Sequence, residues 1–196
     1  MDETTAPVLD PGRKKTKTGY FWALARDDRP WCGDDPPGVA FTYAPGRSGQ
    51  YAEDILTGFS GTLQVDGYAG YNRLLRRPAQ DIRLAYCWAH ARRKLYEVAK
   101  TGTTPIADEG LKQIAALYRT EKDIRGQSPE ARLIARQERS KPVIDAFESW
   151  LIAHRARVSA KSPIGEALKY IAKYWDGLCL FLTDGRIELD SNAVER

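Results

Sequence analysis

The sequence has no long hydrophobic run and few cysteines, and each shortage excludes a class of protein. The longest apolar stretches, such as Leu178 to Leu182, are far too short to cross a bilayer. The first residues, MDETTAPVLDPGRKKTKTG, start with acidic side chains and contain no apolar core, so they form neither a secretory signal nor a membrane anchor. The three cysteines lie far apart without a CxxC pair, which excludes a disulfide framework and fits a reducing compartment. We therefore expect a soluble, cytoplasmic protein.

Histidine is scarce and the net charge is small. Cys87 and His90 have the spacing of half a zinc site, but only His154 and two remote cysteines remain to complete it, so we expect no zinc. The formal net charge is +4, and any affinity for nucleic acid must therefore come from local clusters of basic residues. A chain of 196 residues that is 42% hydrophobic can bury the core of one domain, or of one domain with a large insertion.

The first hundred residues alternate apolar runs with turn residues, which is typical of an α/β fold. Proline and glycine exclude regular structure from the loop RPWCGDDPPG, and the runs on either side of it are expected to pair as a hairpin. The sequence predicts strands at 19–27, 39–43, 62–65 and 82–87, and helices at 51–59 and 88–100.

From about Pro105 to Leu182 the period changes to that of helices, which marks a separate subdomain. Ser128-Pro129 and Ser162-Pro163 each place a hydroxyl at an N-cap and a proline at the first helical position. The last long helix is expected to carry a single apolar seam that packs inside the molecule and does not form a dimer zipper; its residues are Ile164, Leu168, Ile171, Trp175, Leu178 and Leu182.

Two acidic residues, Asp66 and Glu195, lie at the predicted end of a strand and near the predicted start of a helix. Asp66 ends an apolar run and is followed by Gly67 and Gly70, which is how a strand delivers a carboxylate to the edge of a sheet, although an aspartate there is more often a turn former. The closing segment DGRIELDSNAVER has a helix N-cap candidate at Asp190 and then Glu195, which by itself is equally explained as an exposed glutamate favoured by the helix dipole.

Five segments occur in an order that is similar to the transposases of the insertion sequence 66 family: DETTAPVLDPGRKKTKTG, DDRPW, LQVDGYAGYN, CWAHARRK and DGRIELDSNAVER. The resemblance runs from Asp2 to Arg196. Family members carry further sequence on both sides, so we expect this chain to be a partial copy. Only Met1 precedes Asp2 and one residue follows Glu195, which puts the catalytic competence of the chain itself in doubt.

The resemblance implies an RNase H-like α/β fold in which a mixed sheet with helices is interrupted by a large all-helical insertion. It places the α/β core at 1–100, the helical insertion at 101–183 and the return to the core at 184–196. It also implies a catalytic triad of metal-binding carboxylates, Asp2, Asp66 and Glu195. Two Mg²⁺ ions, or Mn²⁺ in their place, suit such oxygen ligands, and they would support cleavage of DNA strands and their transfer into a target.

A basic neighbourhood lies around the second aspartate, and DNA phosphates are its natural partner. The alternative is a solvated helix face with incidental basic residues. The candidate DNA-binding residues are Arg73, Arg76, Arg77, His90, Arg92, Arg93 and Lys94. The five tryptophans stand in apolar patterns, which favours core packing over base stacking. The resemblance implies DNA ends and target DNA as partners, oligomers with other transposase copies, accessory proteins encoded by the element, and association with the nucleoid.

Two other functions stay open at this point. The chain is alternatively a non-catalytic remnant that binds DNA or a full-length transposase. A third reading, from another class, is a carboxylate-pair hydrolase of a small substrate such as a glycoside, which would act without a divalent metal.

Overall fold

The computed structural model describes residues 1–76, 81–102 and 104–191. The strands are β1 (Asp2–Asp10), β2 (Lys15–Arg26), β3 (Gly38–Ala44), β4 (Gly61–Val65) and β5 (Ile82–Tyr86). The helices are α1 (Gly49–Ile55), α2 (Trp88–Ala99), α3 (Pro105–Ile124), α4 (Pro129–Ala135), α5 (Lys141–Arg155), α6 (Pro163–Lys173) and α7 (Trp175–Cys179). Short 3₁₀ segments are η1 (Arg29–Trp31), η2 (Ala69–Arg76) and η4 (Leu180–Leu182), and η3 (Arg136–Ser140) is a turn of π-helix.

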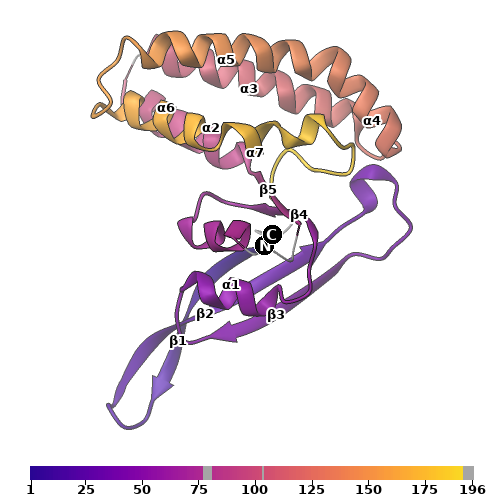
Figure 1. Ribbon diagram of the computed structural model, residues 1–196. Coiled ribbons are helices and arrows are strands. Elements are labelled where there is room, and N and C mark those ends of the chain that lie inside the picture. Colours follow the sequence, from indigo (N-terminus) through magenta and orange to yellow (C-terminus); the bar gives the residue numbers. More distant parts are fainter. Residues whose placement is uncertain (77–80, 103, 192–196) are drawn as a thin grey trace.

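Helices and strands are segregated within the molecule. Figure 1 shows α2 to α7 gathered on one side and the strands β1 to β3 with helix α1 on the other, with β4 and β5 between them. The mixed α/β class predicted from the sequence is confirmed. Among the described residues, no helix is long and apolar enough to span a membrane.

Strands β1, β2 and β3 form an antiparallel sheet in that order. The predicted hairpin of the two strands on either side of the loop at 29–38 is confirmed by β2 and β3, in which Phe21 lies opposite Tyr43. The prediction that this loop excludes regular structure was wrong in one place, because η1 forms there around Pro30. Proline fits the first turn of a helix because an N–H at that position has no partner within the helix.

Strands β4 and β5 form a separate parallel pair, with Val65 opposite Tyr86. Both strands were predicted within a residue of their observed ends. The helix predicted at 51–59 is shorter than expected, because α1 ends at Ile55 and Gly58 then adopts a positive φ of 81° that ends the helical path. The Met1 nitrogen donates a hydrogen bond to the Gln64 carbonyl at 2.8 Å, so the start of β1 lies against β4 and links the two sheets.

Residues 105–182, which we call the helical region, contain helices throughout as predicted. Both predicted N-caps are confirmed: the Ser128 hydroxyl accepts from the Ala131 amide at 3.3 Å, and the Ser162 hydroxyl accepts from the Gly165 amide at 3.1 Å. The single last helix was wrong, because it is divided at Tyr174 into α6, α7 and η4.

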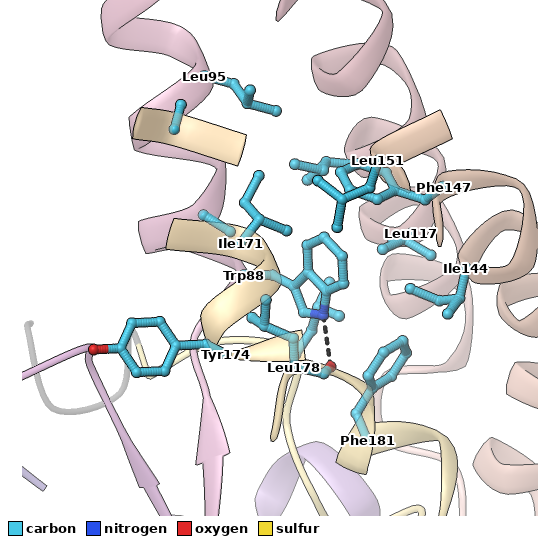
Figure 2. Close-up of a cluster of buried hydrophobic side chains, with 14 of the residues drawn as sticks. Trp88, Leu95, Leu117, Ile144, Phe147, Leu151, Ile171, Tyr174, Leu178 and Phe181 are labelled. Atoms are coloured by element: carbon cyan, nitrogen blue, oxygen red, sulfur yellow. Dashed lines mark hydrogen bonds between the residues drawn. The ribbon is translucent and has the colours of Figure 1, made fainter. Parts of the chain in front are cut away.

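The apolar seam of these last elements nevertheless faces the inside of the molecule, as predicted. It joins the largest group of buried apolar side chains, the helical cluster, which is built from β5, α2, α3, α5, α6, α7, η4 and residues 187–189. Trp88 lies at its centre (Figure 2), fully buried, edge-on to Phe147 at 5.5 Å between ring centroids. The Trp88 indole N–H donates to the Leu178 carbonyl at 2.8 Å, so its polar atom is satisfied within the core.

A second group of buried side chains, the sheet cluster, lies beneath the strands and includes Trp22, Leu63, Val65 and Tyr71. The two clusters meet at β5, which gives Leu84 to the sheet cluster and Ala85 to the helical cluster. The predicted boundary near residue 100 stays a prediction, and the packing runs across it because α2 contacts both α3 and α6.

Candidate active site

Asp66 follows β4 directly, at the carboxyl edge of the parallel pair. Its Oδ1 accepts a hydrogen bond from the Tyr68 amide at 2.8 Å, so this carboxylate does form a turn, as the simpler reading held. Its Oδ2 accepts no hydrogen bond from any of the described residues. The turn therefore orients the carboxylate and leaves one oxygen available for a ligand.

Asp2 is the first residue of β1 and Asp66 follows the last residue of β4, and strand alternation turns both side chains away from the sheet cluster. Leu63 and Val65 point into the sheet cluster, so the alternation of a strand sends Gln64 to the opposite face and continues to Asp66. On β1, Glu3 points inward to the sheet cluster, and the same alternation puts Asp2 on the other face.

The electrostatic surroundings of the Met1 amine place these two carboxylates near one atom. Burial lowers the pKa of this amine to about 6, while the charges of Asp2, Asp66 and Glu3 act in the opposite direction. Asp2 and Asp66 therefore both act electrostatically on the Met1 amine, which lies where the two sheets meet.

Glu3, adjacent to Asp2, has a structural role that the sequence did not indicate. Its side chain has no exposed surface and pairs with Arg47 at 2.5 Å, and it accepts a hydrogen bond from the Tyr71 hydroxyl at 2.6 Å. Burial raises the pKa of Glu3, and the bonds from Tyr71 and Arg47 act against that rise. Because its oxygens are already bonded to protein donors, Glu3 is not a ligand candidate. Recognising β1 as a strand would have shown that Glu3 and Asp2 face opposite ways.

The helical region reaches the candidate site through a row of tyrosines. The Tyr174 hydroxyl donates to the Gly67 carbonyl at 2.6 Å, and Figure 2 shows the Tyr174 ring extending out of the helical cluster towards the strands. Tyr174 packs against Tyr86 and Tyr170, with ring centroids 4.3 and 4.9 Å away. Burial raises the pKa of Tyr86 to about 12, and the charges of Tyr174 and Asp66 add to the rise.

Gly67 is needed where this row meets the loop after Asp66. A Cβ atom at this position would lie 2.6 Å from the Tyr170 hydroxyl oxygen and 2.9 Å from the Tyr174 ring. The missing side chain therefore allows α6 to approach the residue that follows Asp66.

Residues 184–191, which we call the return segment, bring the chain back from the helical region to the strands. Gln64 lies on β4, two residues before Asp66, and its side-chain amide donates to the Glu188 carbonyl at 2.7 Å. Four residues before Glu195, the Ser191 amide donates to the Cys87 sulfur at 3.3 Å, immediately after β5. Glu195 and its expected helix lie outside the described residues, but the segment that leads to them is held at the edge that carries Asp66.

Contacts from α2 and α3 fix the end of the return segment. The Trp88 amide donates to the Leu189 carbonyl at 3.1 Å, and the Tyr118 hydroxyl donates to Asp190 Oδ2 at 3.0 Å. Cys87 therefore has a packing role beside this segment. Burial acts to raise the pKa of the Cys87 thiol. Hydrogen bonds with His90 and Ser191 act to lower it and together outweigh burial, so the pKa of this thiol lies below its usual value.

Two buried arginines, missed by the sequence analysis, hold the other side of the return segment. Arg132 contacts Glu188 at 2.5 Å and Glu121 at 3.2 Å. Arg136 contacts the same Glu121 at 2.7 Å and donates to the Asp184 carbonyl at 3.1 Å. Both arginines are at most 1% exposed, and buried cations need such partners. Arg132 and Arg136 are four residues apart, a spacing that exposed arginines on a helix also show, so no sequence signal distinguished these buried arginines from surface ones.

The donors at the candidate site are oxygen atoms, which suit Mg²⁺ or Mn²⁺. Among residues 1–76, 81–102 and 104–191, no three histidine, cysteine or acidic side chains are grouped closely enough to hold a metal ion. Of the three predicted ligands, Asp2 and Asp66 are among the described residues and Glu195 lies outside them.

The predicted DNA-binding residues are distributed over two elements. Arg92, Arg93 and Lys94 are exposed on α2, whereas Arg73 on η2 is paired with Glu53 at 3.0 Å. Of the others, Arg76 is exposed, His90 is half-buried beside Cys87, and Arg77 lies outside the described residues.

Comparisons with known proteins agree over the whole chain. The family described as "Transposase IS66 family" matches residues 1–196. Similar proteins from Sinorhizobium fredii (strain NBRC 101917 / NGR234) include "Uncharacterized protein y4jD", 47% identical, and "Uncharacterized protein y4qI", 43% identical. These matches cover 100% of this chain but 39% and 37% of the two relatives, so the chain spans about two fifths of their length. No solved structure matches the chain. With the family match and these relatives covering all of its residues, the chain belongs to the IS66 family of transposases.

Proposed function

We propose that this chain contributes the catalytic carboxylates of an IS66 transposase that cuts and joins DNA in a metal-dependent reaction. The observation that carries the proposal is the position of Asp2 at the start of β1 and of Asp66 after β4, where the two sheets meet and to which the return segment leads before Glu195. Because the chain spans about two fifths of its relatives, the activity of the whole protein is part of the proposal.

The strand arrangement supports an RNase H-like core. One bond, from the Met1 nitrogen to the Gln64 carbonyl, joins the start of β1 to β4, so the antiparallel sheet of β1, β2 and β3 meets the parallel pair of β4 and β5 there. Antiparallel and parallel pairings both occur, and we propose that they belong to the mixed sheet that the resemblance to the family implies.

Asp2, Asp66 and Glu195 would hold two Mg²⁺ ions. When bound, such ions polarise the scissile phosphate and favour the ionised form of the attacking oxygen. Asp66 is suited to this role because the Tyr68 amide fixes its Oδ1 and leaves its Oδ2 available. The contacts of Gln64 and Cys87 with the return segment would set the position from which Glu195 reaches the same edge.

One arrangement serves both steps of transposition. In cleavage a water oxygen forms the new bond to phosphorus, the bond to the 3′ oxygen breaks, and that oxygen leaves as a 3′ hydroxyl after taking up a proton. In strand transfer the freed 3′ hydroxyl loses its proton, attacks a target phosphate and displaces another 3′ oxygen. Only the attacking oxygen differs, so the same carboxylates act in both steps.

The test is nicking of a supercoiled plasmid that carries the ends of an element of this family, with Mg²⁺ or Mn²⁺. We expect the chain to nick this plasmid and Asp66→Asn to reduce the rate by at least about a hundredfold, because one negative ligand is lost. Asp54→Asn on α1 is the matched control, since Asp54 is exposed and its carboxylate accepts a hydrogen bond only from the Gln50 side chain among the described residues. Equal nicking rates in the two variants would contradict the assignment of Asp66 as a catalytic metal ligand.

The same experiment separates the alternatives. DNA binding without metal-dependent nicking would indicate a non-catalytic remnant. Hydrolysis of a small substrate without divalent metal, and indifference to DNA, would indicate a carboxylate-pair hydrolase. We further propose that the protein acts on bacterial DNA in the cytoplasm, as an oligomer with other transposase copies and with accessory proteins of the element.

A further inference from the structure

We propose that Lys94 on α2 and Lys173 on α6 form a phosphate-binding surface that holds the DNA backbone beside Asp66. The inference rests on the proposed function and adds to it a role for the helical region, whose helix α6 would contact the DNA. The partner is the phosphodiester backbone, which lysine binds as a point charge irrespective of base sequence.

The two lysines lie over the row of tyrosines that approaches the candidate site. The Lys94 ammonium is 5.4 Å from the centre of the Tyr170 ring, and the Lys173 ammonium is 4.7 Å from the centre of the Tyr174 ring. Tyr170 and Tyr174 are themselves in contact, so the two cations stand over adjoining rings.

This row ends at the residue that follows Asp66. The Tyr174 hydroxyl bonds to the Gly67 carbonyl, and the Tyr170 hydroxyl lies against the Gly67 Cα. A DNA strand whose scissile phosphate is placed at Asp66 would therefore pass the lysines with its neighbouring phosphates.

Within residues 1–76, 81–102 and 104–191, no carboxylate neutralises the charge of this surface. Both lysines are exposed, and no carboxylate of the described residues forms an ion pair with either of them. Elsewhere cations are commonly paired: Lys141 with Asp145, Lys100 with Glu97 and Arg139 with Asp123. Arg92 and Arg93 extend the unpaired positive surface along α2. An exposed, unpaired basic surface next to a pair of carboxylates favours an anionic polymer over a simple solvated helix face.

Neighbouring aromatic rings give the lysines defined positions. Cation–π contacts of this kind restrict flexible side chains before the phosphate arrives. Because Tyr170 is half-buried and in contact with both Tyr174 and Lys94, its ring is not free to stack on a base. We therefore assign phosphate contacts to this surface and no base readout.

The test measures binding of the 196-residue chain to a random-sequence duplex of about 30 base pairs in EDTA, across about 50 to 300 mM KCl. Lys94→Ala and Lys173→Ala should each lower the slope of log affinity against log salt by about 0.9, and the double variant by about 1.8. Near 0.1 M salt each lost contact corresponds to a roughly eightfold weaker affinity. Lys94→Arg should keep the wild-type slope, because it preserves the charge.

Lys141→Ala is the matched control, since this exposed lysine on α5 is already paired with Asp145 and should leave the slope unchanged. Circular dichroism checks that every variant is folded. Wild-type slopes in both lysine variants, or the absence of salt-dependent binding by the wild-type chain, would overturn the inference. Failure of the proposed function looks different: the lysine variants would change DNA binding while the wild-type chain fails to nick DNA.

Discussion

The two guanidinium groups of Arg132 and Arg136 share Glu121, a single carboxylate on α3. We expect Glu121→Gln to lower the free energy of unfolding by about 3–5 kcal/mol, because it leaves two buried cations with one remaining carboxylate between them, Glu188. Urea denaturation followed by circular dichroism measures the change. Glu109→Gln, an exposed position on the same helix, should change it by less than about 0.5 kcal/mol. Equal stability of the two variants would contradict the buried network.

At the scale of residues, the sequence predicted the position of Asp66 but not its surroundings. An apolar run that ends in aspartate and glycine is a local signal, and it places Asp66 at the edge of a strand. Glu3 and Arg47 are far apart in the sequence and become partners only when β1 meets the loop between β3 and α1, which no local pattern reveals. Arg136 is similar, because its partners come from α3 and from the return segment.

Among the elements, those with a strong local period or a clear cap were predicted well. The capped starts of α4 and α6 and the strands β2 to β5 follow from hydroxyl, proline and apolar patterns. The break at Tyr174 was not predicted, because the apolar seam continues through it without interruption in the sequence. At the break the Tyr174 hydroxyl bonds to Gly67, a tertiary contact that no local pattern reveals.

The return segment also approaches the backbone at the start of α4 closely, and a substitution at Gly185 tests this packing of two elements. A Cβ atom at Gly185 would lie 1.9 Å from the Pro129 carbonyl oxygen, at the start of α4. We expect Gly185→Ala to destabilise the protein by about 1–3 kcal/mol, because backbone atoms must move to admit the methyl group. Thermal unfolding would then shift by roughly 2–4 °C per kcal/mol.

Gly38→Ala on β3 provides the comparison for this glycine, because a Cβ there meets nothing within 4 Å. It should leave the melting temperature nearly unchanged. Similar losses in both variants would show that the return segment does not approach α4 as closely as described.

On the scale of the whole molecule, the sheet cluster and the helical cluster are joined and do not form independent cores. β5 contributes buried side chains to both, and Tyr86 packs against each of them. The bonds from Gln64 to Glu188 and from Tyr174 to Gly67 add polar links across the same boundary. Unfolding one cluster would expose apolar surface of the other, which favours a single cooperative transition.

We therefore predict that buried cysteines in the two clusters become accessible to a thiol reagent at the same urea concentration. Cys179 reports on the helical cluster, where burial raises the pKa of its thiol to about 12 and makes the reactive thiolate rare in the folded protein. The cysteine introduced by Ala52→Cys, at a fully buried position of α1, reports on the sheet cluster. Thiol labelling with peptide mass spectrometry should give one midpoint for both, coincident with the loss of helical circular dichroism, while the exposed Cys32 reacts at every urea concentration as the internal control. Two separated midpoints would show that β5 does not couple the clusters, and that the helical region unfolds independently of the strands that carry Asp2 and Asp66.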